Sequence, residues 1–209
     1  MAKNPFFIEM SKIRSITIIS SFLLLGCARL FGWDIHAPGL LSQNFERKIN
    51  PMHERIALYL PPETLVYQSK DRGGRFADPQ TFHVGEAFGP MIIEGMQNAF
   101  DEFILLETQP TKEMMKRYQI PYLCIVRIRG FKNRVTMKGQ AVSLFAEAIV
   151  FDSEMKKLAQ FESRGTSDAR AVFKKKGGPE VNLNAAVEEN VFAIVEYLQD
   201  SIRNQIWKT

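Results

Sequence analysis

Alternation of apolar and polar positions with a period of two predicts most of the strands of this chain. The first predicted strand stops at Pro61-Pro62, and Gly73-Gly74 marks the turn of a hairpin or extended loop. A later strand is expected to end at Gly130, before a polar turn at 131–134. The predicted strands are 55–60, 64–68, 76–84, 103–107, 122–129, 135–151 and 158–163.

A period near 3.6 replaces the period of two in three segments, which we predict to be helices. They cover 85–103, 111–118 and 184–207, and Thr111 is expected to cap the second. A short helical turn is also expected at 41–49, where every fourth residue is apolar.

The order of these elements predicts the fold class. Strand, hairpin, helix, short helix, three strands and helix follow one another along the chain. This order is typical of an α+β two-layer sandwich, in which two long helices cover one face of a mainly antiparallel sheet. We expect the last three strands to be antiparallel neighbours, because consecutive strands usually pair.

The apolar run from Ile16 to Leu25 has no such period and has the character of an export signal. Lys12 and Arg14 precede it, and Gly26 follows it as the small residue before a cleavage site. It is too short to span a bilayer, which takes about 20 apolar residues. Translation from the internal Met10 would give a more compact signal and the same mature protein.

The residues that close this run, Leu24-Leu25-Gly26-Cys27, resemble the lipobox of bacterial lipoproteins. The resemblance implies that Cys27 carries a diacylglyceryl group, that the peptide is cut before it and that the new amino group is acylated. A thiol is required because it is nucleophilic enough near neutral pH. Ala28 points to the outer membrane, since the inner-membrane retention signal of enterobacteria is an aspartate at that place. An ordinary secretory signal with a chance cysteine and a buried apolar strand are the alternatives.

The domain organisation follows from this signal. We expect a signal peptide at 1–26, a lipid-anchored tether at 27–53 and one periplasmic α+β domain at 54–209. The tether shows no sustained period and contains Pro38, Gly39 and Pro51.

Composition and charge narrow the function classes. Cleavage of 26 residues from 209 leaves 183, which is enough for one domain with its own core. The signal carries three basic residues and one acidic residue, so the formal charge of +4 falls to +2 in the mature chain. This small charge gives little support to a nucleic-acid partner, and we expect none. Only Cys124 would remain unmodified, which excludes a disulfide within the mature chain.

The sequence shows no catalytic constellation. His36, His53 and His83 lie in separate segments without metal-ligand spacing, and a hydrogen-bonded structural role is the favoured interpretation of His83. Cys124 alternates with apolar residues as a core residue does, and Glu188-Glu189 fall on a helix surface. We therefore expect no enzyme, no metal and no cofactor.

Basic residues supply the one polar pattern with a functional interpretation. They lie around the predicted turn at 131–134, with Phe131 among them, and in a later loop. Such groups could contact phosphates of lipopolysaccharide, anionic lipid headgroups or an acidic protein. The alternative is a solvated hairpin end that discourages aggregation. The residues concerned are Arg127, Arg129, Lys132, Arg134 and Lys138, and Lys174, Lys175 and Lys176.

The domain also resembles a broad group of small periplasmic lipoproteins in three features: the lipobox, the segment 84–88 that leads into a helix ending at 100–103, and the strand–turn–strand pattern at 142–161. The group includes the LPS-assembly lipoprotein family, auxiliary lipoproteins of ABC transport systems, and export lipoproteins with a TolB amino-terminal-like domain. It implies a non-catalytic scaffold or accessory subunit of an envelope transport, secretion or assembly complex, with protein partners and with self-association left open. A binding module for lipopolysaccharide, lipid or polysaccharide is the alternative, and a periplasmic hydrolase is a third.

Overall fold

The computed structural model describes residues 32–72, 79–136, 139–167 and 178–204. The chain divides into two units, residues 1–33 and 34–209, and the architecture below is that of the second. The predicted signal peptide, Cys27, Lys138 and Lys174 to Lys176 lie outside the described residues.

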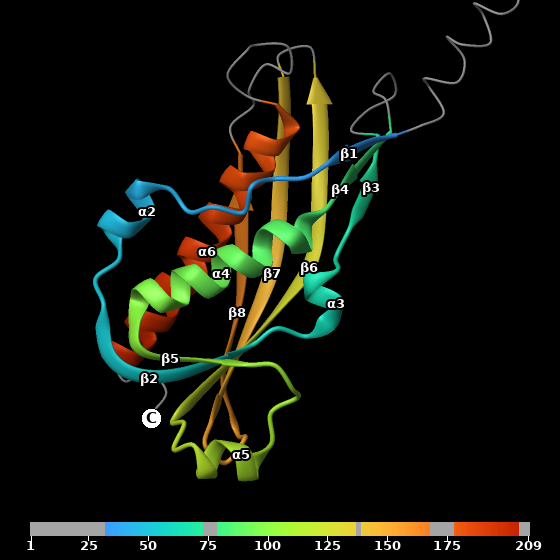
Figure 1. Ribbon diagram of the computed structural model, residues 1–209. Helices are drawn as coiled ribbons and strands as arrows, with labels where there is room; N and C mark the ends of the chain where they lie inside the picture. Colours follow the sequence, from blue (N-terminus) through green and yellow to red (C-terminus); the bar gives the residue numbers. More distant parts are fainter. Residues whose placement is uncertain (1–31, 73–78, 137–138, 168–177, 205–209) are drawn as a thin grey trace, which may run out of the picture. The chain divides into compact units, whose positions relative to one another are not determined.

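A five-stranded sheet with the order β5-β2-β6-β7-β8 forms one layer of the domain (Figure 1). Strand β2 pairs in parallel with β5 on one side and with β6 on the other. The long pairings of β6 with β7 and of β7 with β8 are antiparallel, and these antiparallel pairings are the ones that the sequence predicted. A small second sheet has the order β1-β4-β3. The strands are β1 Trp33–Ile35, β2 Met52–Tyr59, β3 Ser69–Asp71, β4 Gln80–Phe82, β5 Phe100–Leu106, β6 Tyr122–Thr136, β7 Gly139–Asp152 and β8 Lys157–Thr166.

Two long helices, α4 and α6, form the other layer and share one core cluster with the sheet face beneath them (Figure 1). The short helix α5 packs through Met115 on the opposite face, against Ala57 of β2 and Leu123 of β6. The α+β two-layer prediction is therefore confirmed. The helices are α2 Gln43–Lys48, α3 Pro62–Leu65, α4 Val84–Ala99, α5 Lys112–Arg117 and α6 Pro179–Arg203.

Strand β6 does not end at Gly130, and the turn that we predicted at 131–134 is wrong. The pairing with β7 shifts register between Ile128 and Gly130, so Arg129 is the extra residue of a β-bulge. Even-numbered residues such as Val126 face the core before the bulge, and odd-numbered ones such as Phe131 do so after it. The bulge breaks the alternation in the sequence, which is why one continuous strand looked like two.

Part of the segment assigned to the tether packs on the domain. Ile35, Phe45 and Ile49 are buried in the core shared with α4 and α6. The side chain of Asn184 on α6 accepts a hydrogen bond from the backbone of Gly39 at 3.1 Å. The domain therefore begins near residue 34 rather than at 54, and the helical turn predicted at 41–49 is α2 of this domain.

Three other boundaries differ from the prediction. Helix α6 begins at Pro179 instead of near Asn184, because Pro suits the first helical turn and Leu183 is already buried. Helix α4 stops at Ala99, and the chain enters β5 directly. Residues 62–65 form the single helical turn α3, which overlaps the strand predicted at 64–68. Among the described residues the predicted hairpin consists of β3 and β4, and the predicted turn at Gly73-Gly74 lies outside them.

Candidate functional site

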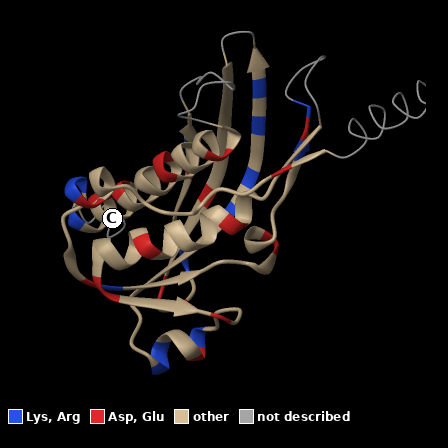
Figure 2. Cartoon of the chain, turned by 45° about the horizontal axis from the view of Figure 1, so that its top comes forward, with Lys and Arg blue, Asp and Glu red and all other residues tan. Residues whose placement is uncertain are grey.

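Four of the predicted basic residues lie on the face of β6 that points away from α4 and α6. The bulge at Arg129 switches the outward-facing positions from odd to even numbers. Arg127 before the bulge and Lys132 and Arg134 after it therefore lie on the same side of the sheet. Figure 2 shows them as repeated blue bands along one long strand. The sequence thus identified residues that lie together, but on a strand face and not at a turn.

The neighbouring strands add an aromatic and a fifth cation to this row. Phe145 of β7 is the register partner of Gly130 on β6 and of Arg164 on β8. Directly paired residues in an antiparallel sheet project to the same side. The Nζ atom of Lys132 lies 5.3 Å from the centre of the Phe145 ring, and Cζ of Arg164 lies 5.5 Å from it. We call Arg127, Arg129, Lys132, Arg134 and Arg164, with Phe145 among them, the basic face.

One cation of the basic face, Arg129, neutralises a buried carboxylate of the same sheet. Arg129 forms an ion pair with Glu147, whose side chain is only 2% exposed, and the amide of Gln160 donates a second hydrogen bond to that carboxylate. A buried carboxylate needs such partners, since burial of an unpaired charge is costly. Arg129 is therefore mainly a structural residue.

The other three exposed cations carry no such partner. Among the described residues, no ion pair involves Lys132, Arg134 or Arg164. Arg164 makes only a long hydrogen bond of 3.5 Å, to the hydroxyl of Ser143. These three side chains are available to an anionic ligand.

A shallow hollow lies in the middle of the basic face. Gly130 leaves it open, because a Cβ atom added there would meet nothing within 4 Å. Cations on the rim beside an apolar ring can bind a phosphate or carboxylate that is attached to an apolar group. The hollow is lined by Arg129, Gly130, Phe131, Lys132, Phe145, Ala146, Glu162 and Ser163.

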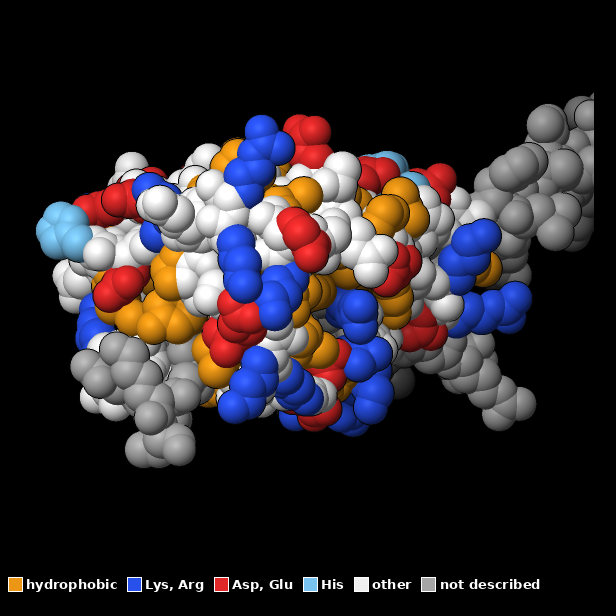
Figure 3. Space-filling view, turned by 90° about the horizontal axis from the view of Figure 1, so that it is seen from below, with side chains coloured by type: hydrophobic (Ala, Val, Ile, Leu, Met, Phe, Trp, Pro, Cys, Tyr) orange, Lys and Arg blue, Asp and Glu red, His pale blue; other side chains and the backbone are white. Residues whose placement is uncertain are grey.

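The basic residues of α5 present a different surface. Lys112 and Lys116 both pair with Glu154, the latter at 2.8 Å. These two hydrogen bonds, of which that from Lys112 has the larger effect, hold the pKa of Glu154 below its usual value. Seen from below, basic, acidic and hydrophobic side chains are mixed across this end of the molecule (Figure 3). The charges of Lys112 and Lys116 are thus offset by Glu154.

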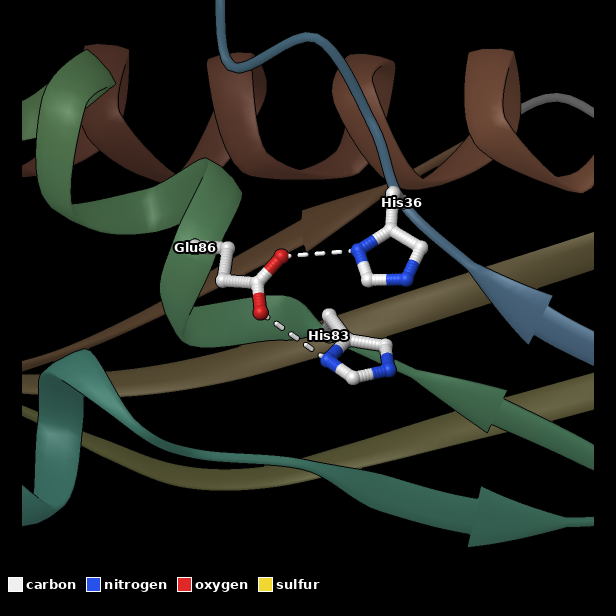
Figure 4. Close-up of side chains that lie close together, drawn as sticks. All are labelled: His36, His83 and Glu86. Atoms are coloured by element: carbon white, nitrogen blue, oxygen red, sulfur yellow. Dashed lines mark hydrogen bonds and ion pairs between the residues drawn. The ribbon is translucent and has the colours of Figure 1, made fainter.

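A second polar cluster joins the start of α4 to the chain after β1. Nδ1 of His36 lies 2.8 Å from Oε2 of Glu86, and Nδ1 of His83 lies 3.0 Å from Oε1 of the same carboxylate (Figure 4). The two imidazole rings are stacked, with centres 3.9 Å apart. The hydrogen bond from His36 is the largest cause of a lowered pKa of Glu86, and the two histidines also lower it electrostatically.

Local structure explains why these three residues meet. His83 is the residue before α4 and Glu86 lies in its first turn, so they are three positions apart on one side of the helix start. The backbone N–H of His83 donates to the carbonyl of Ile35 at 3.0 Å, which brings the next residue, His36, alongside. Sequence spacing missed this cluster, because His36 and His83 are far apart in the chain and meet only through backbone pairing. His53 is elsewhere and pairs with Asp101.

The remaining reactive side chains have structural surroundings. Cys124 is buried, and burial raises the pKa of its thiol to about 12, so it is not a nucleophile near neutral pH. The carboxylate of Glu188 accepts hydrogen bonds from Ser42, and that of Glu189 accepts them from Thr166. The two acids on α6 thus hold other segments in place.

Comparisons with known proteins show likenesses in shape only. No known family profile and no curated protein matches the sequence. Solved structures with a similar arrangement include the hypothetical protein CT253 of Chlamydia trachomatis, with 10% identity, a TM-score of 0.45 and 72% of this chain and 97% of that one covered. A dodecamer of PelC from Paraburkholderia phytofirmans has 11% identity and a TM-score of 0.37, with 70% of this chain and 89% of that one covered. Lipoprotein GNA1162 of Neisseria meningitidis has 9% identity and a TM-score of 0.33, with 74% of this chain and 99% of that one covered. At these TM-scores the likenesses assign neither family nor function.

Within the described ranges, no helix is both long enough and apolar enough to cross a membrane.

Proposed function

We propose that this chain is a lipid-anchored protein of the bacterial outer membrane, and that its domain is a non-catalytic accessory subunit of an envelope complex. The basic face is the surface by which it would bind an anionic partner. The observation that carries the proposal is a set of three exposed cations on a sheet face that α4 and α6 leave open. These cations, Lys132, Arg134 and Arg164, form no ion pair with any residue that the structure describes. The lipobox at Cys27 supports the anchor, and Ala28 supports the outer membrane.

The physical case for binding rests on charge together with an apolar contact. Each basic side chain near an anionic surface contributes about 1 kcal/mol. Phe145 adds an aromatic contact between two of the cations. An anchor keeps the domain close to its partner, so even a contact of modest affinity would be occupied.

A second candidate uses the same face for lipopolysaccharide or another anionic lipid. The arrangement that favours it is the pair of cations, Lys132 and Arg164, on either side of the Phe145 ring. A phosphate beside acyl or sugar groups presents the complementary chemistry. This candidate differs from the first only in the partner and not in the residues.

The test compares two triple variants with the same loss of charge. Lys132→Ala/Arg134→Ala/Arg164→Ala removes the unpaired cations of the basic face, and Lys112→Ala/Lys116→Ala/Arg117→Ala removes three from α5. Recovery of integral envelope proteins with the full chain from detergent-solubilised membranes, and binding to lipopolysaccharide vesicles, are measured for both. Loss of three contacts of about 1 kcal/mol each should weaken binding about 100-fold in the first variant and little in the second.

The pattern of losses identifies the partner class. Loss of envelope proteins alone supports the accessory subunit, and loss of vesicle binding alone supports the lipid-binding candidate. Equal losses in both triple variants would mean that only net charge matters. Unchanged binding in the first variant would show that the basic face binds neither partner. Circular dichroism of each variant shows that the fold is retained.

A further inference from the structure

The cluster at the start of α4 has the donor set of a metal centre. His36, His83 and Glu86 each offer one ligand atom, and these atoms all lie within 4.8 Å of one another. Two imidazoles and one carboxylate are ligands that Zn²⁺ takes in proteins, with three protein ligands leaving a fourth position open. The cluster comes from two separate segments, so folding brings the ligands together.

The far nitrogen of His83 has a carboxylate partner. Oδ1 of Asp34 lies 3.4 Å from Nε2, so a hydrogen on Nε2 can be donated to it. The other nitrogen, Nδ1, lies 3.2 Å from the side-chain amide of Gln68 and 3.0 Å from Oε1 of Glu86. When Nε2 carries the hydrogen, the lone pair of Nδ1 is available to a metal ion.

Nδ1 of His83 and Oε1 of Glu86 lie 3.0 Å apart, so both atoms can bind the same cation. An acid on the far nitrogen, as Asp34 is here, is the usual partner that orients a metal-bound histidine.

The charge around the cluster suits a cation. The start of α4 is the positive end of the helix dipole, which disfavours a cation, but the carboxylates of Glu86 and Asp34 lie beside the imidazoles and offset it.

We propose that His36, His83 and Glu86 bind a divalent transition-metal ion, for which Zn²⁺ is the best match, with Asp34 as the positioning residue of His83. The ligand atoms would be Nδ1 of each histidine and one oxygen of Glu86, and a water would complete the tetrahedron. His36 is 54% exposed on its side chain, so the ion can enter from solvent. Bound there, it would fasten the chain after β1 to the first turn of α4.

The test uses the full chain, purified without a polyhistidine tag and freed of metal with a chelator. Zn²⁺ alone is titrated against a chromophoric competitor. We expect one ion per chain, an affinity at least about 100-fold lower for His36→Ala or His83→Ala, and about 10-fold lower for Asp34→Asn, as for partners that orient a ligand. His53→Ala is the matched control, since His53 pairs with an acid elsewhere, and should bind as the unaltered protein does.

A structural readout complements the titration. X-ray absorption of the zinc form should show only nitrogen and oxygen ligands at about 2.0–2.2 Å, with imidazole scattering that disappears in the double variant His36→Ala/His83→Ala. His36 is exposed, so the His36→Ala variant should keep its fold even where His83→Ala does not. Absence of stoichiometric binding, or binding that survives in the double variant, would overturn the proposal.

Discussion

Gly165 shows how close α6 comes to β8. A Cβ atom at this position would lie 1.9 Å from the backbone oxygen of Ala186 and 2.6 Å from the backbone nitrogen of Asn190. Neither backbone atom can move without shifting the helix. Gly165→Ala should therefore lower the free energy of unfolding by about 3 kcal/mol, in the range of overpacked cores, as measured by urea denaturation.

Gly130 provides the matched control for this substitution. It lies on the same sheet, but a Cβ atom there would meet nothing within 4 Å. Gly130→Ala should change the free energy of unfolding by less than about 1 kcal/mol. Equal effects of the two substitutions would contradict the packing of α6 on β8 described above.

Single residues also show where sequence reasoning reached its limit. The sequence identified Arg127, Arg129, Lys132 and Arg134 as a group, and the structure does bring them together. The sequence could not show that Arg129 forms an ion pair with the buried Glu147, because that contact depends on the register of β6 and β7. Arg164 was missed for the same reason, since only strand pairing places it beside Phe145.

At the level of elements, a substitution in α2 tests whether the domain begins near residue 34. The Phe45 side chain is 2% exposed and meets Phe192 of α6 edge to face, with ring centres 5.9 Å apart. Phe45→Ala should lower the free energy of unfolding by about 3–5 kcal/mol, because it leaves a cavity in the core. Thermal or urea unfolding followed by circular dichroism measures the loss.

Leu40 is the control from the same segment, because its side chain is 63% exposed. Leu40→Ala should cost less than about 0.5 kcal/mol, as surface substitutions usually do. If residues 34–49 formed a free tether, both substitutions would have this small effect.

The elements themselves were predictable where the period was regular. The helix of α4 and the strands β7 and β8 follow clear periods of 3.6 and two, and Thr111 caps α5 by accepting a hydrogen bond from the backbone of Met114 at 3.2 Å. The bulge in β6 was not predictable, because an extra residue breaks the alternation just as a turn does. The packing of α2 was missed because six helical residues give too short a pattern.

On the scale of the whole molecule, the sequence was enough to predict the fold class, but not which distant side chains lie next to one another. Element order was enough for an α+β sandwich of two layers. The cluster of His36, His83 and Glu86 depends on β1 lying beside β4, two strands of three residues each, which no periodicity announces. Both candidate sites thus consist of residues that the sheets bring together.

The proposed function depends on attachment of a lipid at Cys27, which would hold the domain at an envelope membrane. Mass spectrometry of the protein isolated from its own bacterial cells tests this most directly. We predict an amino-terminal peptide that starts at Cys27 and carries a diacylglyceryl group on sulfur and an acyl chain on nitrogen. A free thiol at Cys27, or residues 1–26 still attached, would contradict the account.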